Sequence, residues 1–155
     1  MIKLLKLTCS IFICLVAGAI GSLLTTPAIA TWYATLKKPF FNPPNWIFAP
    51  VWTLLFILMG IALYLVWEEK NGAGKGRAVT FFFLQLLLNI CWSLFFFYLK
   101  APLLAFVEVI VFWIMILLTI MEFNKISKTA AMILFPYLLW VSFASFLNLS
   151  IVLLN

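Results

Sequence analysis

The chain has 155 residues, of which 67% are hydrophobic and 9% charged; soluble domains carry about 25% charged residues, so this composition indicates a membrane protein with one domain, residues 1–155. Histidine and aspartate are both absent, which excludes Ser-His-Asp and Cys-His catalytic sites and histidine-ligated metals, and we expect no metal and no required cofactor. The net charge of +6 comes from scattered lysines and arginines without a basic stripe, which excludes a nucleic-acid partner.

Five apolar stretches lie between the charges and the Gly/Pro clusters. Each is long enough to cross about 30 Å of hydrocarbon as a helix. None alternates apolar with polar residues as a barrel strand does. The sequence therefore predicts an all-α membrane protein, a bundle of five transmembrane helices. The predicted spans are about 7–30, 46–67, 78–99, 101–121 and 129–154.

The distribution of positive charge predicts the orientation. One side of the membrane carries only Lys37, Lys38 and Lys100. The other side, which holds the N-terminus, carries Lys3, Lys6, Lys70, Lys75, Arg77, Lys125 and Lys128. Because cytoplasmic loops are richer in Lys and Arg, we expect a cytoplasmic N-terminus and an external C-terminus. We expect a multi-pass protein of a bacterial or archaeal cell membrane.

The first apolar stretch has an alternative interpretation. Lys3 and Lys6 precede it and Ala28-Ile29-Ala30 ends it, as in a secretory signal peptide with its cleavage site. Its uncharged run of 24 residues exceeds the usual apolar core of 7 to 15 residues. The length favours a retained helix, while cleavage stays open.

The first connection, about 31–45, is the longest and differs from an ordinary linker. Prolines restrict the unfolded chain and aromatic rings supply apolar surface, so this segment can pack as a lid. A membrane-interface aromatic belt is the alternative. The candidate lid residues are Trp32, Lys37, Lys38, Pro39, Pro43 and Pro44.

Three predicted helices each place aromatic and small or polar residues on one face. Helical spacing aligns them, and an apolar face with a few polar groups suits a flat hydrophobic ligand. Lipid contact is the alternative for each aromatic ring, and Asn89 and Asn148 can instead bond across helices. The aligned residues are Trp52 and Phe56; Gln85, Asn89, Trp92 and Phe96; and Trp140, Ala144 and Asn148.

Two further features concern the membrane interior. Glu108 is the one acid well inside a predicted span, so it is protonated, paired, or close to water near the helix end. Ala17, Gly18, Gly21 and Ser22 in the first span allow close helix contact, which predicts a homodimer, although the same residues can serve packing within one chain.

Three motifs in order resemble one family. The segment WYATLKKPFFNPPNWIFAPVW, residues 32–52, resembles the signature of the TspO/MBR family of tryptophan-rich sensory and translocator proteins. The third predicted helix, with Gln85-x-x-x-Asn89-x-x-Trp92-Ser93, and the fifth, with Pro136-Tyr137-x-x-Trp140, are similar to that family's patterns. The resemblance implies a five-helix bundle, often dimeric, whose pocket opens beneath the first loop. It also places Tyr33 at or near that pocket, with Trp52, Phe56, Asn89, Trp92 and Trp140.

The resemblance implies a receptor or carrier for porphyrins or related tetrapyrroles, including haem, and for isoquinoline-carboxamide or benzodiazepine-type ligands. One alternative is a light- and oxygen-dependent porphyrin-degrading enzyme, with Trp52 and Trp140 as electron donors. A second is a small multidrug exporter, which would need Glu108 as its coupling carboxylate. Animal members carry a sterol motif at the end of the fifth helix, a Tyr followed within a few residues by Lys or Arg. This chain has no Lys or Arg after Tyr137, which puts sterol binding in doubt. Elsewhere, Leu94-x-x-x-Tyr98-x-Lys100 matches the loose pattern of that motif.

Overall fold

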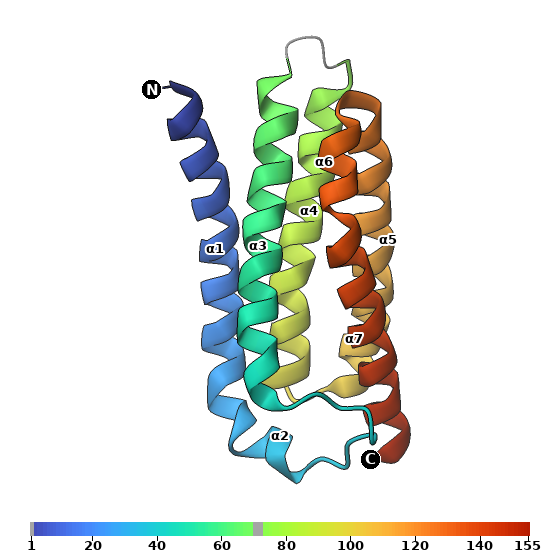
Figure 1. The fold of residues 1–155 in the computed structure, drawn as a ribbon. Helices are drawn as coiled ribbons and strands as arrows, with labels where there is room; N and C mark the ends of the chain where they lie inside the picture. Colours follow the sequence, from blue (N-terminus) through green and yellow to red (C-terminus); the bar gives the residue numbers. More distant parts are fainter. Residues whose placement is uncertain (1, 70–72) are drawn as a thin grey trace.

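The computed structural model describes residues 2–69 and 73–155, and it is an all-α bundle (Figure 1). Five helical segments in this part of the chain are long and apolar enough to cross a membrane, as predicted. They are α1 (Ile2–Ile29), α3 (Asn45–Glu68), α4 (Lys75–Ser93) with its π-helical continuation η1 (Leu94–Tyr98), α5 (Pro102–Ile126), and α6 (Lys128–Ile133) with α7 (Phe135–Leu154). The protein is a multi-pass integral membrane protein.

The helices extend past the charges at which the predicted spans ended. The first begins at Ile2 instead of about residue 7, and the fourth ends at Ile126 instead of about 121. The charges are compatible with helix here because they pair with one another: Arg77 and Lys125 both contact the Glu122 carboxylate, at 2.8 and 2.7 Å. Lys70, one of the cations on the predicted cytoplasmic side, lies outside the described residues.

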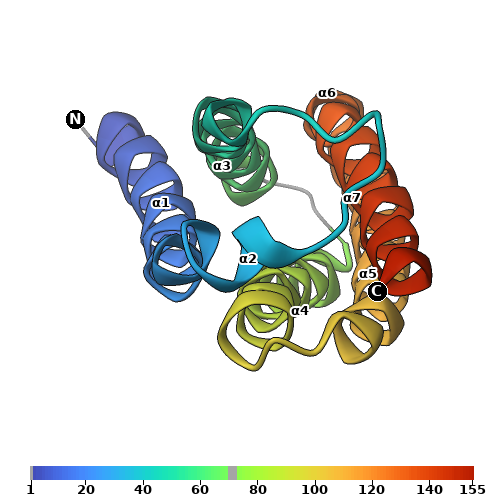
Figure 2. The same ribbon diagram turned by 90° about the horizontal axis from the view of Figure 1, so that it is seen from below.

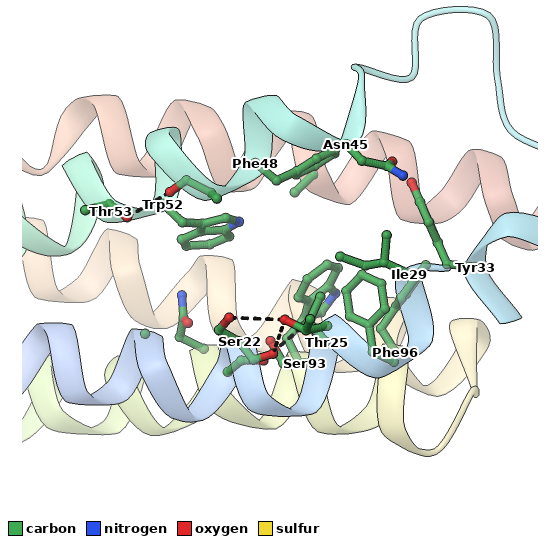
Figure 3. Close-up of a pocket in the computed structure, with 18 of the residues that line it drawn as sticks. Ser22, Thr25, Ile29, Tyr33, Asn45, Phe48, Trp52, Thr53, Ser93 and Phe96 are labelled. Carbon is green, nitrogen blue, oxygen red and sulfur yellow. Dashed lines mark hydrogen bonds between the residues drawn. The ribbon is translucent and has the colours of Figure 1, made fainter. Parts of the chain in front are cut away.

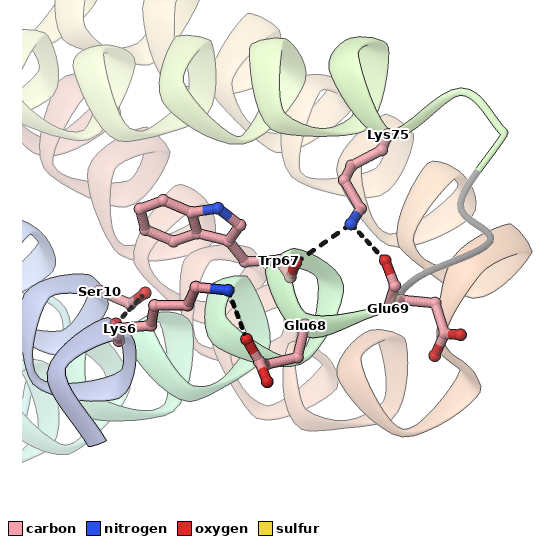
Figure 4. A network of polar contacts seen from close by, with 6 residues as sticks. All are labelled: Lys6, Ser10, Trp67, Glu68, Glu69 and Lys75. Carbon is pink, nitrogen blue, oxygen red and sulfur yellow. Dashed lines mark hydrogen bonds and ion pairs between the residues drawn. The ribbon is translucent and has the colours of Figure 1, made fainter. Parts of the chain in front are cut away.

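Polar contacts also join the ends of α1, α3 and α4 (Figure 4). The Lys6 ammonium lies 2.7 Å from the Glu68 carboxylate and links α1 to α3. The Lys75 ammonium donates to the backbone carbonyls of Trp67 and Glu69, which belong to the end of α3 and the residue after it. This end of the bundle is therefore held by charge, whereas the opposite end is covered by the lid.

Two of the spans depart from regular α-helical geometry. The predicted fifth span is divided at Leu134, because Pro136 has no backbone N–H to continue the ladder and its ring clashes with the preceding turn. The third span ends in the π-helix η1, where the Leu99 N–H donates to the Leu94 carbonyl five residues earlier, at 2.8 Å. Such π-helical turns often occur at functional sites.

The helices form a ring in the order α1, α3, α6–α7, α5 and α4 when seen from the lid end (Figure 2). The connection from α1 to α3 contains the one-turn helix α2 (Trp32–Thr35), a helix within the predicted loop of about 31–45, and crosses this end of the ring. The N-terminus lies at the end away from the lid and the C-terminus at the lid end (Figure 1). Which end faces the cytoplasm stays a prediction.

Small residues bring α1 close to its neighbours within the chain. A Cβ on Gly60 would lie 2.5 Å from the Ile11 Cα, and one on Gly18 would lie 2.6 Å from the Phe56 ring. A Cβ on Gly21 would lie 3.3 Å from the Ser93 Oγ. The glycines predicted to form a dimer contact thus serve packing within one chain. The homodimer itself stays a prediction.

Candidate functional site

A cavity of about 420 Å³ lies inside the ring beneath the lid. Residues of α1, α3, α4, η1 and α7 line it, and the lid contributes Tyr33. In Figure 3, Phe48 and Trp52 of α3 face Ser22 and Thr25 of α1 across the space, while Ile29 and Tyr33 lie at the lid end. The volume falls within the range of small-molecule pockets, roughly 300–1,000 Å³.

All the residues predicted to bind a ligand line this one cavity. They come from the lid and four different helical segments, which the chain brings together only when folded. The residues are Tyr33, Trp52, Phe56, Asn89, Trp92, Phe96, Trp140 and Ala144. Asn148, predicted only as a polar residue inside the membrane, lines the cavity as well. Their contact with a ligand stays a prediction.

Aromatic rings form two walls of the cavity. On α3, Trp52 stacks on Phe56 with ring centroids 5.7 Å apart. Phe48 of α3 contacts Trp140 of α7 edge-on at 6.0 Å, so these two helices meet through their rings near the lid. A flat apolar ligand between such walls would gain contact with rings on both sides.

The third wall is formed where α4 continues directly into η1. Trp92 stacks on Phe96 with centroids 5.3 Å apart, and Trp32 of the lid contacts Phe96 at 5.7 Å. The Trp92 indole N–H donates to the Asn148 Oδ1 at 3.1 Å, and the Asn148 amide donates to the Pro102 carbonyl at 2.9 Å. Asn148 therefore has the cross-helix role that was one of its two interpretations, and it fixes the Trp92 ring.

A second polar chain lies deeper in the bundle. The Asn89 amide donates to the Tyr137 hydroxyl at 3.3 Å, and that hydroxyl donates to the Gln85 Oε1 at 2.7 Å. Of these three residues, only Asn89 lines the cavity, so the structure places Gln85 behind the wall. Asn89 thus combines a cavity position with a bond across helices.

One buried donor on the cavity wall has no partner. The Trp140 Nε1 makes no hydrogen bond to any residue that the structure describes, although it is buried. An unpaired buried donor costs about 1–3 kcal/mol. A ligand that offers an acceptor to Trp140 would remove that cost.

Helix α1 forms a wall of the cavity that the sequence did not predict. Gly18, Ser22, Thr25, Thr26 and Ile29 line the cavity. The hydroxyls of Thr25 and Thr26 donate to carbonyls one turn earlier in their own helix, at 2.8 Å each, so this wall is less polar than its composition suggests. Of these residues, Gly18 and Ser22 belong to the predicted dimer contact. The hydroxyl residues that follow Gly18 along the helix were the available signal in the sequence.

The lid is an ordered structure over the cavity. Tyr33 is buried, and its hydroxyl donates to the Asn42 Oδ1 at 2.9 Å. Burial raises the pKa of the Tyr33 hydroxyl above its ordinary value, although the hydrogen bond to Asn42 acts in the opposite direction, so the hydroxyl stays neutral at physiological pH. The Lys38 ammonium lies 4.5 Å from the centroid of the Tyr33 ring, within cation–π range. These contacts favour the lid interpretation of the segment.

Prolines shape the rest of the lid. The Asn42 N–H donates to the Pro39 carbonyl at 3.0 Å and closes a turn. Pro43 accepts from the Asn42 amide at 3.0 Å, and Pro44 takes an extended conformation immediately before α3. The tandem prolines therefore end the lid and begin the next helix.

The lid is also joined to the end of α7. The Asn155 Oδ1 accepts from the Lys37 N–H at 2.9 Å, and the Asn155 amide donates to the Lys37 carbonyl at 3.0 Å. The same amide donates to the Ile151 carbonyl at 2.9 Å, which ties the side chain to its own helix. We call this pair of contacts between Asn155 and Lys37 the lid clasp.

Glu108 lies outside the cavity lining. It is 8% exposed, and neither carboxyl oxygen has a hydrogen-bond partner among the described residues. Glu108 is therefore buried in the bundle. The predicted option that it lies close to water near the helix end does not describe this position. Ionisation at this position would leave a charge that no described residue compensates.

The cavity offers few ligands for a metal. In the part of the chain that the structure describes, neither the cysteines nor the methionines line it, and Cys14 is fully buried in the core. Tyr33 is the one lining residue able to ligate haem iron among the types known to do so. The site suits binding by apolar contact better than by coordination.

Known proteins are similar in sequence to this chain, two of them over 99% of its length. The profile of the TspO/MBR family matches residues 10–154. The chain is 46% identical to the tryptophan-rich protein TspO of Chlorobaculum tepidum, over 99% of this chain and 98% of that protein. It is 48% identical to the protein of the same name from Archaeoglobus fulgidus, over 99% of both. It is also 36% identical to the human translocator protein, over 76% of this chain and 70% of that protein. The chain therefore belongs to the TspO/MBR family, and this membership supports a role as a membrane receptor or transporter.

Proposed function

We propose that the cavity binds porphyrins or related tetrapyrroles, and that the protein acts as their membrane receptor or carrier. The observation that carries the proposal is an apolar cavity of about 420 Å³ with aromatic rings on three walls and a lid over one end. Isoquinoline-carboxamide and benzodiazepine-type ligands, also flat and apolar, would occupy the same space. The physiological ligand is one of this chemical class.

Binding would depend on stacking and burial. Trp52, Trp92 and Trp140 supply the rings. Porphyrin carboxylates would lie under the lid, where Lys37 and Lys38 are the nearby cations. Since the cavity wall supplies neither cysteine nor methionine from the described residues, metal-free porphyrin should bind about as tightly as haem.

The test is a titration of purified protein with protoporphyrin and with haem, followed by porphyrin absorbance. Trp140→Ala should weaken the binding of both by about 30-fold, as expected when a buried aromatic anchor is truncated. Trp67→Ala is the matched control, because Trp67 is 44% exposed at the other end of α3 (Figure 4) and should leave both affinities unchanged. Equal affinity in Trp140→Ala and the parent protein would contradict the proposal. A strong preference for haem with a ligand-field shift would instead indicate an iron ligand, with Tyr33 as the first candidate.

The carboxylate contacts have a separate test. A double replacement of Lys37 and Lys38 by Gln should weaken protoporphyrin binding more than binding of its dimethyl ester, because only the free acid carries charge. Equal weakening of both ligands would show that the lysines act on the lid and not on the carboxylates.

A second candidate function is light- and oxygen-dependent porphyrin breakdown. It is favoured by the position of both Trp52 and Trp140 on the cavity wall, where each could give an electron to a bound, excited ring. Product analysis after illumination in the presence of oxygen, for the parent protein and for Trp140→Phe, separates breakdown from binding alone. The exporter alternative has less support, because its coupling residue Glu108 lies outside the cavity lining.

A further inference from the structure

A second hollow, of about 520 Å³, lies on the outer surface of the bundle between α1 and η1. Its apolar wall is formed by residues 20–28 of α1 and by Phe97. Thr31, Tyr98 and Lys100 line its other part, at the lid end. The hollow is separate from the central cavity, and Phe97 is the one described residue that lines both.

The polarity of the hollow changes along the helix axis. Ile20 and Leu23 are 42% and 77% exposed and supply apolar surface deep in the spanning segment. Thr31 and Tyr98 bring hydroxyl groups to the lid end. From Ile20 to its last residue Ile29, α1 rises about 14 Å, close to the hydrocarbon depth of one leaflet, about 15 Å. The hollow therefore has the length and the polarity gradient of one lipid chain with its headgroup.

Lys100 brings a positive charge to the polar end, and its backbone is held in a defined turn. Its φ of 53° is left-handed, and it is the one non-glycine residue with positive φ in the described chain. The turn is closed on both sides, because the Leu99 N–H donates to the Leu94 carbonyl at 2.8 Å and the Ala101 N–H to the Phe95 carbonyl at 3.0 Å. Such strain persists only where the surroundings enforce the conformation.

The charge of Lys100 is not compensated by a carboxylate of the described chain. The three ion pairs in the described residues use Lys6, Arg77 and Lys125. These belong to the start of α1, the start of α4 and the end of α5, which lie away from the lid (Figure 1). A cation at the edge of an apolar hollow in a membrane protein complements an anionic headgroup.

We propose that this hollow is a binding site for an anionic phospholipid. One acyl chain lies along residues 20–28 of α1 and against Phe97, and the phosphate group contacts the Lys100 ammonium and the Tyr98 hydroxyl. Because Phe97 also lines the central cavity, the bound chain supports one wall of that cavity from outside. The proposal does not depend on which ligand the central cavity takes.

The first experiment measures lipid retention. Protein purified in detergent is incubated with phosphatidylglycerol and phosphatidylcholine of the same acyl chains, and bound lipids are counted by native mass spectrometry. The parent protein should retain one phosphatidylglycerol in preference to phosphatidylcholine. Lys100→Asn should lower this retention about fivefold, the scale of one basic residue near an anionic membrane surface. Asn tolerates the left-handed conformation, so the turn is preserved.

Control variants distinguish specific binding in the hollow from nonspecific electrostatic attraction of anionic lipid to any exposed lysine. Lys100→Arg should keep the preference for phosphatidylglycerol. Lys128→Asn removes an exposed cation from the start of α6, far from the hollow, and should have no effect. If Lys100→Asn folds poorly, Lys100→Gly makes the same test, because glycine accepts the positive φ without strain. Equal loss in the Lys100 and Lys128 variants, or equal retention of both lipids by the parent protein, would overturn the proposal.

The second experiment locates the lipid. Phosphatidylglycerol with a photoactivatable acyl chain should label residues 20–28 and Phe97, and Leu23→Ala should reduce this labelling. Leu139→Ala is the matched control, since Leu139 is 68% exposed on α7. Labelling elsewhere would overturn the proposal. Displacement of the probe by cholesterol as readily as by phosphatidylglycerol would indicate an uncharged sterol site and would also overturn it.

Discussion

Replacing Asn155 by Ala should release the lid from α7. The change removes both contacts of the lid clasp, the bond from the Lys37 N–H at 2.9 Å and the bond to the Lys37 carbonyl at 3.0 Å. A net hydrogen bond contributes about 0.5–1.5 kcal/mol, and since Asn155 is exposed the lower part of that range applies to each. Loss of both should cost about 1–2 kcal/mol, which raises the open population of the lid about 5- to 30-fold.

Hydrogen exchange measures this opening without any ligand. The Lys37 amide should exchange faster in Asn155→Ala by the same factor of about 5 to 30, because exchange of a locally protected amide follows the open population. Under the proposed function, the dissociation rate of bound porphyrin should rise in parallel, since release requires the lid to open.

Two variants control for effects other than the clasp. Asn155→Asp keeps the acceptor for the Lys37 N–H and loses the donor to its carbonyl, so it should give a smaller increase in exchange. Asn124→Ala changes an exposed asparagine near the C-terminal end of α5, at the end of the bundle away from the lid, and should leave the Lys37 amide protected. Unchanged Lys37 exchange in Asn155→Ala would refute the reasoning, because other lid contacts would then hold the segment alone.

Two further predictions concern packing and orientation. Gly60→Ala should lower the free energy of unfolding by about 1–3 kcal/mol, because the added Cβ would lie 2.5 Å from the Ile11 Cα; Gly76→Ala, where nothing lies within 4 Å, should be neutral or stabilising in the same thermal unfolding assay. Similar melting temperatures for the two variants would contradict the close contact of α1 and α3. Cysteines placed at Lys37 and Lys75 in a cysteine-free background should be labelled from opposite faces of intact cells, with Lys37 outside, and labelling of both from one face would contradict the five-span topology.

The sequence by itself determined the number and type of the spanning elements. A backbone in lipid has no water to satisfy its polar groups, so long uncharged runs such as residues 78–99 can only be helices. Spacing of three and four residues also determined the cavity-facing side of three helices, because residues one turn apart share a face whatever the neighbours are. For this reason Asn89, Trp92 and Trp140 were found from the sequence and line one cavity.

The tertiary structure alone decided the partners of those faces. Small residues four apart in α1, Ala17 with Gly21 and Gly18 with Ser22, have a spacing that suits a contact within the chain as well as one between two chains. The positions of Phe56 and Ser93 place Gly18 and Gly21 in contacts within the chain. Glu108 lies near a helix end in the sequence, yet the bundle buries it.

The lid clasp likewise required the fold, because Asn155 and Lys37 are 118 residues apart. Local periodicity is carried by each segment, whereas contacts between distant segments depend on how the helices are arranged in the ring. The sequence therefore determined which residues could face a cavity, and the packing of α1 and the lid decided where that cavity is and what closes it.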